Sequence, residues 1–253
     1  MLALLGLSTI ASLTVSLVLA IRLLRLWGRS RQLPELIFGA AFLSAGVLGY
    51  IATIVGSPAT PGLSPNQASN ITLIGIGLLT VGVSLNYLFV WKVFRPDSGW
   101  ARALFWVATG VLAVTVIPIS GYAARSAATQ LDPLTLLGDA TRIGAGAWGA
   151  FESLRYYTLM RRRLRIGLAE PAVTNRFLLW GIATLTTSVI FFATSALVRL
   201  HFSPQEGAVT PGLMTVVSIC TLGVATAQWL AFLPPAFYLR WIEGRASAAE
   251  SAA

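Results

Sequence analysis

The length, composition and charge of this chain exclude an ordinary soluble domain. Its 253 residues are 56% hydrophobic and only 11% charged, with a mean hydropathy of +0.75, whereas soluble domains carry about 25% charged residues. Basic residues outnumber acidic ones by 18 to 9, but they cluster between long apolar runs. They therefore predict contact with a lipid bilayer and its anionic headgroups, and no binding of nucleic acid.

Seven apolar stretches follow one another along the chain, each near the ~20 residues that a helix needs to cross a bilayer. They cover residues 2–21, 36–56, 71–91, 103–123, 134–157, 177–198 and 213–233. Helices are predicted because a barrel strand has only ~10 residues and alternating hydrophobicity. We expect an all-α integral membrane protein, with one seven-transmembrane-helix bundle over residues 1–240 and a short disordered tail over 241–253.

The positions of lysine and arginine predict the orientation, because these residues are retained on the cytoplasmic side of helix ends. Fourteen of them follow the first, third, fifth or seventh apolar stretch: Arg22, Arg25, Arg29, Arg31, Lys92, Arg95, Arg102, Arg161, Arg162, Arg163, Arg165, Arg176, Arg240 and Arg245. The opposite side holds Arg125 and Arg199. The N-terminus is therefore expected outside and the C-terminus in the cytoplasm. The excess of arginine and alanine is typical of a GC-rich bacterial genome. We therefore expect a multi-pass protein of the bacterial inner membrane.

The fifth apolar stretch differs from the others because it contains four charges. Asp139 and Arg142 are three residues apart, as are Glu152 and Arg155, so each pair can meet on one helical face and offset its own desolvation. The two pairs lie roughly 20 Å apart along the helix. Small residues at four-residue spacing over 144–150 allow a neighbouring helix to approach closely. The fifth helix is expected to be central in the bundle, and it is also the weakest span.

Three interpretations of these charges remain open. They can be structural ion pairs that fix packing; Asp139 and Arg142 can line a ligand pocket open to the outside; or Asp139 and Glu152 can belong to a proton or ion path. Asn86 in the third stretch and Gln228 in the seventh are candidate polar neighbours. Each is better explained as an interhelical hydrogen-bond partner than as a ligand contact.

Prolines predict breaks near both ends of the bundle, because each removes a backbone donor and ends or kinks a helix. Pro234 and Pro235 close the seventh stretch, and Pro118 lies near the outer end of the fourth. Besides ending helices, they are candidate hinges through which an outer event alters the cytoplasmic face.

Catalytic and cofactor sites are not predicted. His201 is the only histidine and Cys220 the only cysteine, so the three or four convergent ligands of a zinc site are missing. No Gly-x-Ser-x-Gly elbow occurs. The only lysine, Lys92, ends the third stretch, which excludes a retinal Schiff base midway along the seventh. We expect no enzyme, no metal and no cofactor.

The sequence favours a receptor-like or sensory protein that binds a small or lipophilic ligand in the outer half of the bundle and signals to a separate protein partner. A small-solute or proton-coupled transporter, with Asp139 and Glu152 as coupling sites, is the first alternative. The second is an accessory or scaffold subunit of a membrane complex, in which segment 144–150 contacts another chain.

Overall fold

The computed structural model describes residues 2–57, 60–116, 133–200 and 211–251, and they are helical apart from short turns. The helices are α1 (Leu2–Ser30), α2 (Leu33–Ala41), the π-helix η1 (Phe42–Gly49), α3 (Tyr50–Val55), α4 (Pro65–Phe94), α5 (Gly99–Val116), α6 (Pro133–Leu164), α7 (Pro171–Leu200), α8 (Pro211–Phe232) and α9 (Ala236–Ser251). α2, η1 and α3 form one continuous rod, the second rod of the bundle after α1. The prediction of an all-helical chain is confirmed for these residues.

Six helical segments among the described residues are long and apolar enough to cross a membrane. They are Ala3–Ser30, Leu33–Val55, Pro65–Phe94, Gly99–Val116, Pro171–Ser195 and Gly212–Phe232. α6 is long enough at 32 residues, but its charges lower its hydropathy, as expected for the fifth stretch. The chain is therefore a multi-pass helical membrane protein, and its seventh span and its orientation remain predictions.

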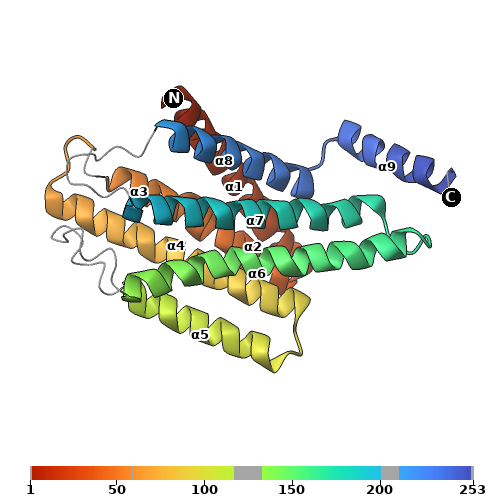
Figure 1. Ribbon diagram of the computed structural model, residues 1–253, viewed down its shortest axis with the longest axis horizontal. Coiled ribbons are helices and arrows are strands. Elements are labelled where there is room, and N and C mark those ends of the chain that lie inside the picture. Colours follow the sequence, from red (N-terminus) through yellow and green to blue (C-terminus); the bar gives the residue numbers. More distant parts are fainter. Residues whose placement is uncertain (1, 58–59, 117–132, 201–210, 252–253) are drawn as a thin grey trace.

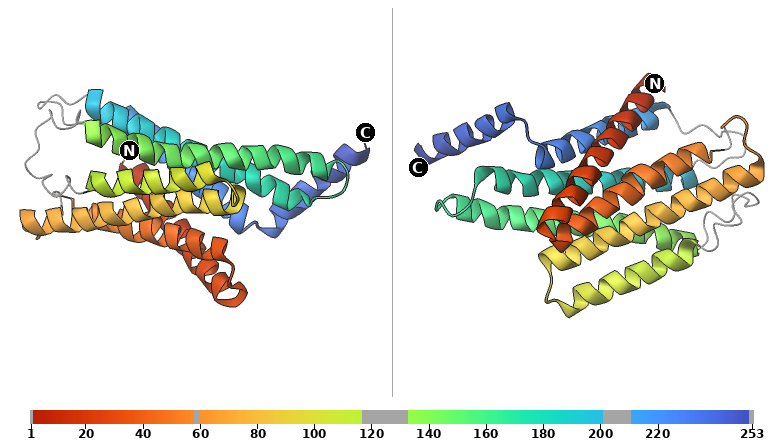
Figure 2. Two further views of the ribbon diagram at one scale, coloured as in Figure 1. Left: turned by 90° about the horizontal axis from the view of Figure 1, so that it is seen from below. Right: turned by 180° about the vertical axis from the view of Figure 1, so that it is seen from behind.

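The helices pack in chain order into a closed ring. Each span contacts the next, and α8 returns to pack against α1. α4, α5, α6 and α7 run along the long axis, whereas α1 crosses them obliquely (Figures 1 and 2). α6 packs against α4, α5 and α7, in agreement with the central position expected for it. The turn after α4 and the turn after α6 lie at the same end as α9.

Two buried clusters lie within this ring. The first joins α1, α2, η1, α7 and α8 through Val15, Leu19, Ala20, Phe38, Phe42, Trp180 and Ala225. The Phe38 ring lies 4.5 Å from that of Phe89 and 4.4 Å from that of Trp180, measured between centroids. The second cluster joins α4, α5 and α6 through Tyr87, Trp91, Ala101, Phe105, Ala108 and Ala145. α4 thus contributes aromatic rings to both halves of the bundle.

Helix α4 begins at a capping box. The Ser64 hydroxyl accepts a hydrogen bond from the Gln67 backbone N–H at 3.3 Å, and the Gln67 side chain accepts one from the Ser64 N–H at 2.9 Å. Pro65 occupies the first turn, where its missing N–H costs nothing. These residues fix the start of α4, which packs against both α5 and α6.

Glycines bring α4 into backbone contact with the second rod. A Cβ placed on Gly75 would lie 2.8 Å from the Thr53 nitrogen and 3.0 Å from the Gly49 oxygen. A Cβ on Gly49 would lie 2.9 Å from the Leu79 nitrogen. Real Cβ atoms do not approach backbone so closely, so both positions require glycine. The sequence did not predict this contact.

The C-terminal segment departs from the expected disordered tail. Pro234 and Pro235 do break the chain after α8, but a new helix, α9, runs from Ala236 to Ser251. The Asn175 side-chain amide of α7 donates a hydrogen bond of 2.8 Å to the Tyr238 hydroxyl. The prolines therefore separate two helices, and a polar contact joins the second of them to α7.

Candidate functional site

Glu152 of α6 is the centre of a three-residue ion-pair cluster. Its side chain is 0% exposed, and its two oxygens bind different arginines: Oε1 lies 2.8 Å from Arg95 Nε, and Oε2 lies 3.3 Å from Arg155 Nη1. The predicted pair of Glu152 with Arg155 is confirmed. Arg95 was predicted only as a cytoplasmic charge, so its contact with Glu152 is new.

Arg95 reaches Glu152 because it stands where α4 ends. Its backbone leaves the helical region, with φ −141° and ψ 47°, while its N–H still donates to the Trp91 carbonyl. The side chain crosses to α6, and its guanidinium also lies 5.8 Å from the centroid of the Trp100 ring. The end of α4 is thereby joined to α6 by a charged hydrogen bond, which is stronger than a neutral one.

The second predicted pair lies near the other end of α6. Arg142 Nη1 is 3.0 Å from Asp139 Oδ1, and the two side chains are 18% and 21% exposed. The neighbouring Thr141 carbonyl accepts a hydrogen bond of 2.8 Å from the Tyr87 hydroxyl. The prediction that these charges pair is confirmed, and their surroundings join α6 to α4 as well.

The remaining predicted site residues are not gathered around one centre. Asn86 lies on α4 between the two ion pairs, and its Oδ1 is buried without a hydrogen-bond partner. Gln228 lies on α8, whose principal contacts are with α1 and α7. Pro234 and Pro235 lie in the break before α9, and Pro118 lies outside the described residues. The structure thus brings Asn86, but not Gln228, to the charged helix.

The small residues of α6 face other helices of the same chain. A Cβ on Gly146 would lie 3.0 Å from the Thr184 oxygen of α7 and would collide with the Ser188 hydroxyl, which donates to the Ile143 carbonyl at 3.1 Å. A Cβ on Gly144 would lie 2.9 Å from the Tyr87 hydroxyl of α4. The predicted close approach is confirmed, and its partners are α7 and α4.

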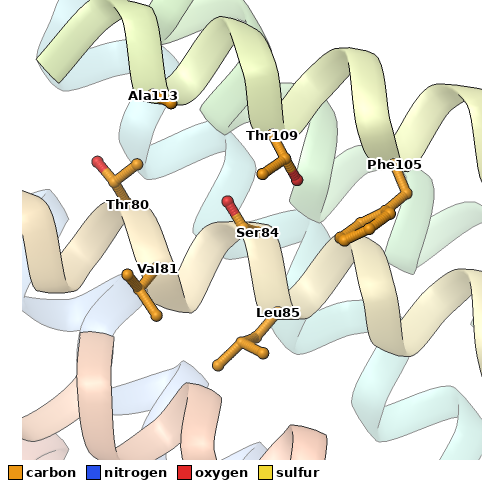
Figure 3. Close-up of a pocket in the computed structure, with 7 residues that line it drawn as sticks. All are labelled: Thr80, Val81, Ser84, Leu85, Phe105, Thr109 and Ala113. Atoms are coloured by element: carbon orange, nitrogen blue, oxygen red, sulfur yellow. The ribbon is translucent and has the colours of Figure 1, made fainter.

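A groove of about 250 Å³ lies between α4 and α5 (Figure 3). Its lining residues are Thr80, Val81, Ser84, Leu85, Phe105, Thr109 and Ala113. The surface is almost entirely apolar, and Figure 3 shows the Thr80 and Ser84 hydroxyls directed toward α5. The sequence did not predict this groove, which lies near the middle of α4.

Two hydroxyls of the groove lack the hydrogen bonds that such groups usually make. Thr184 and Thr226 donate to carbonyls of their own helices, which is the ordinary arrangement within a helix. Thr80 Oγ1 and Thr109 Oγ1 are buried without a partner, and the whole Thr80 residue is 8% exposed. Buried polar atoms without a partner are rare in folded proteins.

Comparisons with protein-family models, with curated proteins and with solved structures found no match for this chain. Within the described residues, no three His, Cys, Asp or Glu side chains are grouped so that they could hold a metal ion. Two arrangements of the described side chains could bind another molecule: the apolar groove and the Arg95–Glu152–Arg155 cluster.

Proposed function

We propose that this chain is a seven-span, receptor-like protein of a bacterial inner membrane, with its N-terminus outside and its C-terminus in the cytoplasm. It binds a lipophilic ligand in the groove between α4 and α5 and signals this binding to a protein partner at the arginine-rich, cytoplasmic end of the bundle. The single observation that carries the proposal is that one helix, α4, forms a wall of the groove and ends at Arg95, which is bound to buried Glu152.

The four charges in the apolar part of α6 are compatible with a seventh span because each of them is paired. A 32-residue helix is about 48 Å long, more than the ~30 Å hydrocarbon thickness. Asp139 pairs with Arg142, and Glu152 pairs with Arg155 and Arg95, so each described acidic group of this helix has a counter-ion. Arg161, Arg162 and Arg163 in its last turn support the cytoplasmic assignment of that end.

Ligand binding in the groove would act on α4 directly. Thr80 and Arg95 are fifteen residues apart, about 22 Å along the helix. An occupant that separates α4 from α5 shifts α4, and the Arg95–Glu152 contact is the point where that shift reaches α6. The proposed ligand site is near the middle of the bundle, whereas the sequence placed it in the outer half beside Asp139 and Arg142.

Filling the groove tests the ligand site. In lipid nanodiscs, a photoactivatable fatty acid should label residues of α4 and α5 that line the groove. Ala113→Phe places a ring in the groove and should reduce this labelling roughly tenfold, which corresponds to about 1.4 kcal/mol of lost binding. Peptide mapping by mass spectrometry measures the labelled residues.

Val114→Phe is the matched control, because Val114 is the next residue of the same helix and is 51% exposed. It should leave labelling of the groove unchanged. Equal labelling in wild type and Ala113→Phe would contradict a ligand site in this groove.

Transport is the alternative that the charges of α6 favour, because buried ionisable residues often mark ion pathways in membrane proteins. If the receptor proposal is correct, proton flux into reconstituted vesicles stays at the level of protein-free vesicles. Asp139→Asn then has no more effect than Asp97→Asn in the exposed turn after α4. Flux that is lost in Asp139→Asn and kept in Asp97→Asn would establish transport and reject the receptor proposal. A pH-sensitive dye inside the vesicles measures it.

The scaffold alternative receives less support. It requires segment 144–150 to be available to another chain, but Gly144 and Gly146 contact α4 and α7 of the same chain.

A further inference from the structure

We infer that Arg95 and Arg155 together bind the phosphate group of an anionic phospholipid at the end of the bundle where α4 stops. The first argument is charge. Two guanidinium groups share the single carboxylate of Glu152, so the cluster retains one positive charge. An anion bound beside the two guanidinium groups would neutralise this charge.

The second argument is the supply of hydrogen-bond donors. Each guanidinium has five N–H groups. Arg95 uses Nε for Glu152, and Arg155 uses Nη1. Within the described residues, neither side chain has a further hydrogen-bond acceptor. The terminal nitrogens of Arg95 and the remaining N–H groups of Arg155 are therefore available to oxygen atoms of a ligand.

The third argument is geometry and access. Both arginines contact the same carboxylate through different oxygens, so both guanidinium groups are held beside one buried group. The Arg95 side chain is 28% exposed and that of Arg155 is 43% exposed, whereas Glu152 is 0% exposed. The carboxylate holds the two cations in place from inside, and their outer donors face the surroundings. Planar guanidinium groups bind phosphate oxygens in pairs.

The fourth argument is the position at the level of lipid headgroups. Trp100, 53% exposed, stands beside Arg95, and Lys92 Nζ lies 4.1 Å from the centroid of the Trp91 ring. Tryptophan is concentrated at membrane interfaces, and basic groups there attract anionic lipids. A phosphate that meets the two arginines at this level is expected to belong to a lipid. This site does not depend on the function proposed for the groove.

Lipid retention in nanodiscs tests the site. Wild-type protein is compared in phosphatidylcholine alone and in a mixture with phosphatidylglycerol, by thermal unfolding and by native mass spectrometry of retained lipid. The wild type should unfold at a higher temperature in the mixture and should retain phosphatidylglycerol. Arg155→Gln should abolish the difference between the two lipids and weaken retention about tenfold. The shorter Arg95–Glu152 contact remains in this variant, and each variant is compared with itself, so a change in its basal stability does not enter.

Arg165→Gln is the matched control, because Arg165 is an exposed arginine beyond the end of α6. It removes the same charge and should keep the lipid effect. Equal retention in wild type and Arg155→Gln would overturn the inference. If Arg155→Gln does not fold, Arg155→Lys keeps the charge without the planar fork, and retention as strong as that of the wild type would count against the site. Inorganic phosphate that stabilises the wild type in phosphatidylcholine as much as phosphatidylglycerol does would identify a free anion and reject the lipid.

Discussion

Glu152→Gln is expected to lower the free energy of unfolding by about 3 kcal/mol. Breaking a buried ion pair costs about 3–5 kcal/mol because the remaining charge is left without a counter-ion. The lower figure applies because Arg95 and Arg155 are 28% and 43% exposed and keep partial access to polar surroundings. Chemical unfolding of purified protein in detergent, followed by circular dichroism, measures the loss.

Glu170→Gln provides the control for this substitution. Glu170 is exposed in the turn before α7, and its side chain has no ion pair among the described residues. The same chemical change there should alter the free energy of unfolding by less than about 0.5 kcal/mol. Similar losses in the two variants would show that the Arg95–Glu152–Arg155 cluster does not join α4 to α6 energetically.

Gly75→Val should cost about 3 kcal/mol or more, because the added atoms meet backbone instead of a side chain that can rotate away. The Cβ alone would lie 2.8 Å from the Thr53 nitrogen and 3.0 Å from the Gly49 oxygen. Overpacking typically costs about 1–3 kcal/mol and more where the structure cannot yield. α4 and the second rod would have to separate along their contact. The midpoint of thermal unfolding in detergent reports the effect.

Gly77→Val tests whether this loss arises from packing. Gly77 lies two residues further along α4, and a Cβ there meets nothing within 4 Å. Both variants make the same exchange in the same helix, so their intrinsic helix propensities change equally. Gly77→Val should therefore remain close to the wild type. If the two variants lost stability equally, the close contact between Gly49 and Gly75 would be refuted.

Local spacing in the sequence was sufficient to predict part of the site. Asp139 with Arg142, and Glu152 with Arg155, are three residues apart, and a helix brings such residues onto one face. The small residues of 144–150 likewise predicted a close helix contact, because the absence of bulk is visible in the sequence. These features depend on one helix only, which is why they needed no knowledge of the tertiary structure.

Features that join separate helices were not predictable in this way. Arg95 and Glu152 are 57 residues apart, and Arg95 resembles every other arginine at a helix end. Thr80 and Thr109 resemble the threonines that donate to their own helix carbonyls, and only the packed structure shows that they do not. The helix after Pro235 was missed because residues 243–253 contain no large apolar residue, and because its contact through Tyr238 is with distant Asn175.

The π-helix η1 determines which neighbouring helices the two halves of the second rod contact. A π-helix closes its hydrogen bonds over five residues instead of four, so each turn takes more residues and the side chains after it point in directions that regular α-helical counting does not give. Before η1, Phe38 packs into the cluster with α1, α7 and α8. At its end, Gly49 lies against α4. Deleting one residue from Phe42–Gly49 would therefore rotate α3 relative to α2 and move Gly49 away from Gly75, although every residue of the contact would still be present. Residues 42–49 thus act as a spacer whose length sets which neighbour each half of the rod can meet.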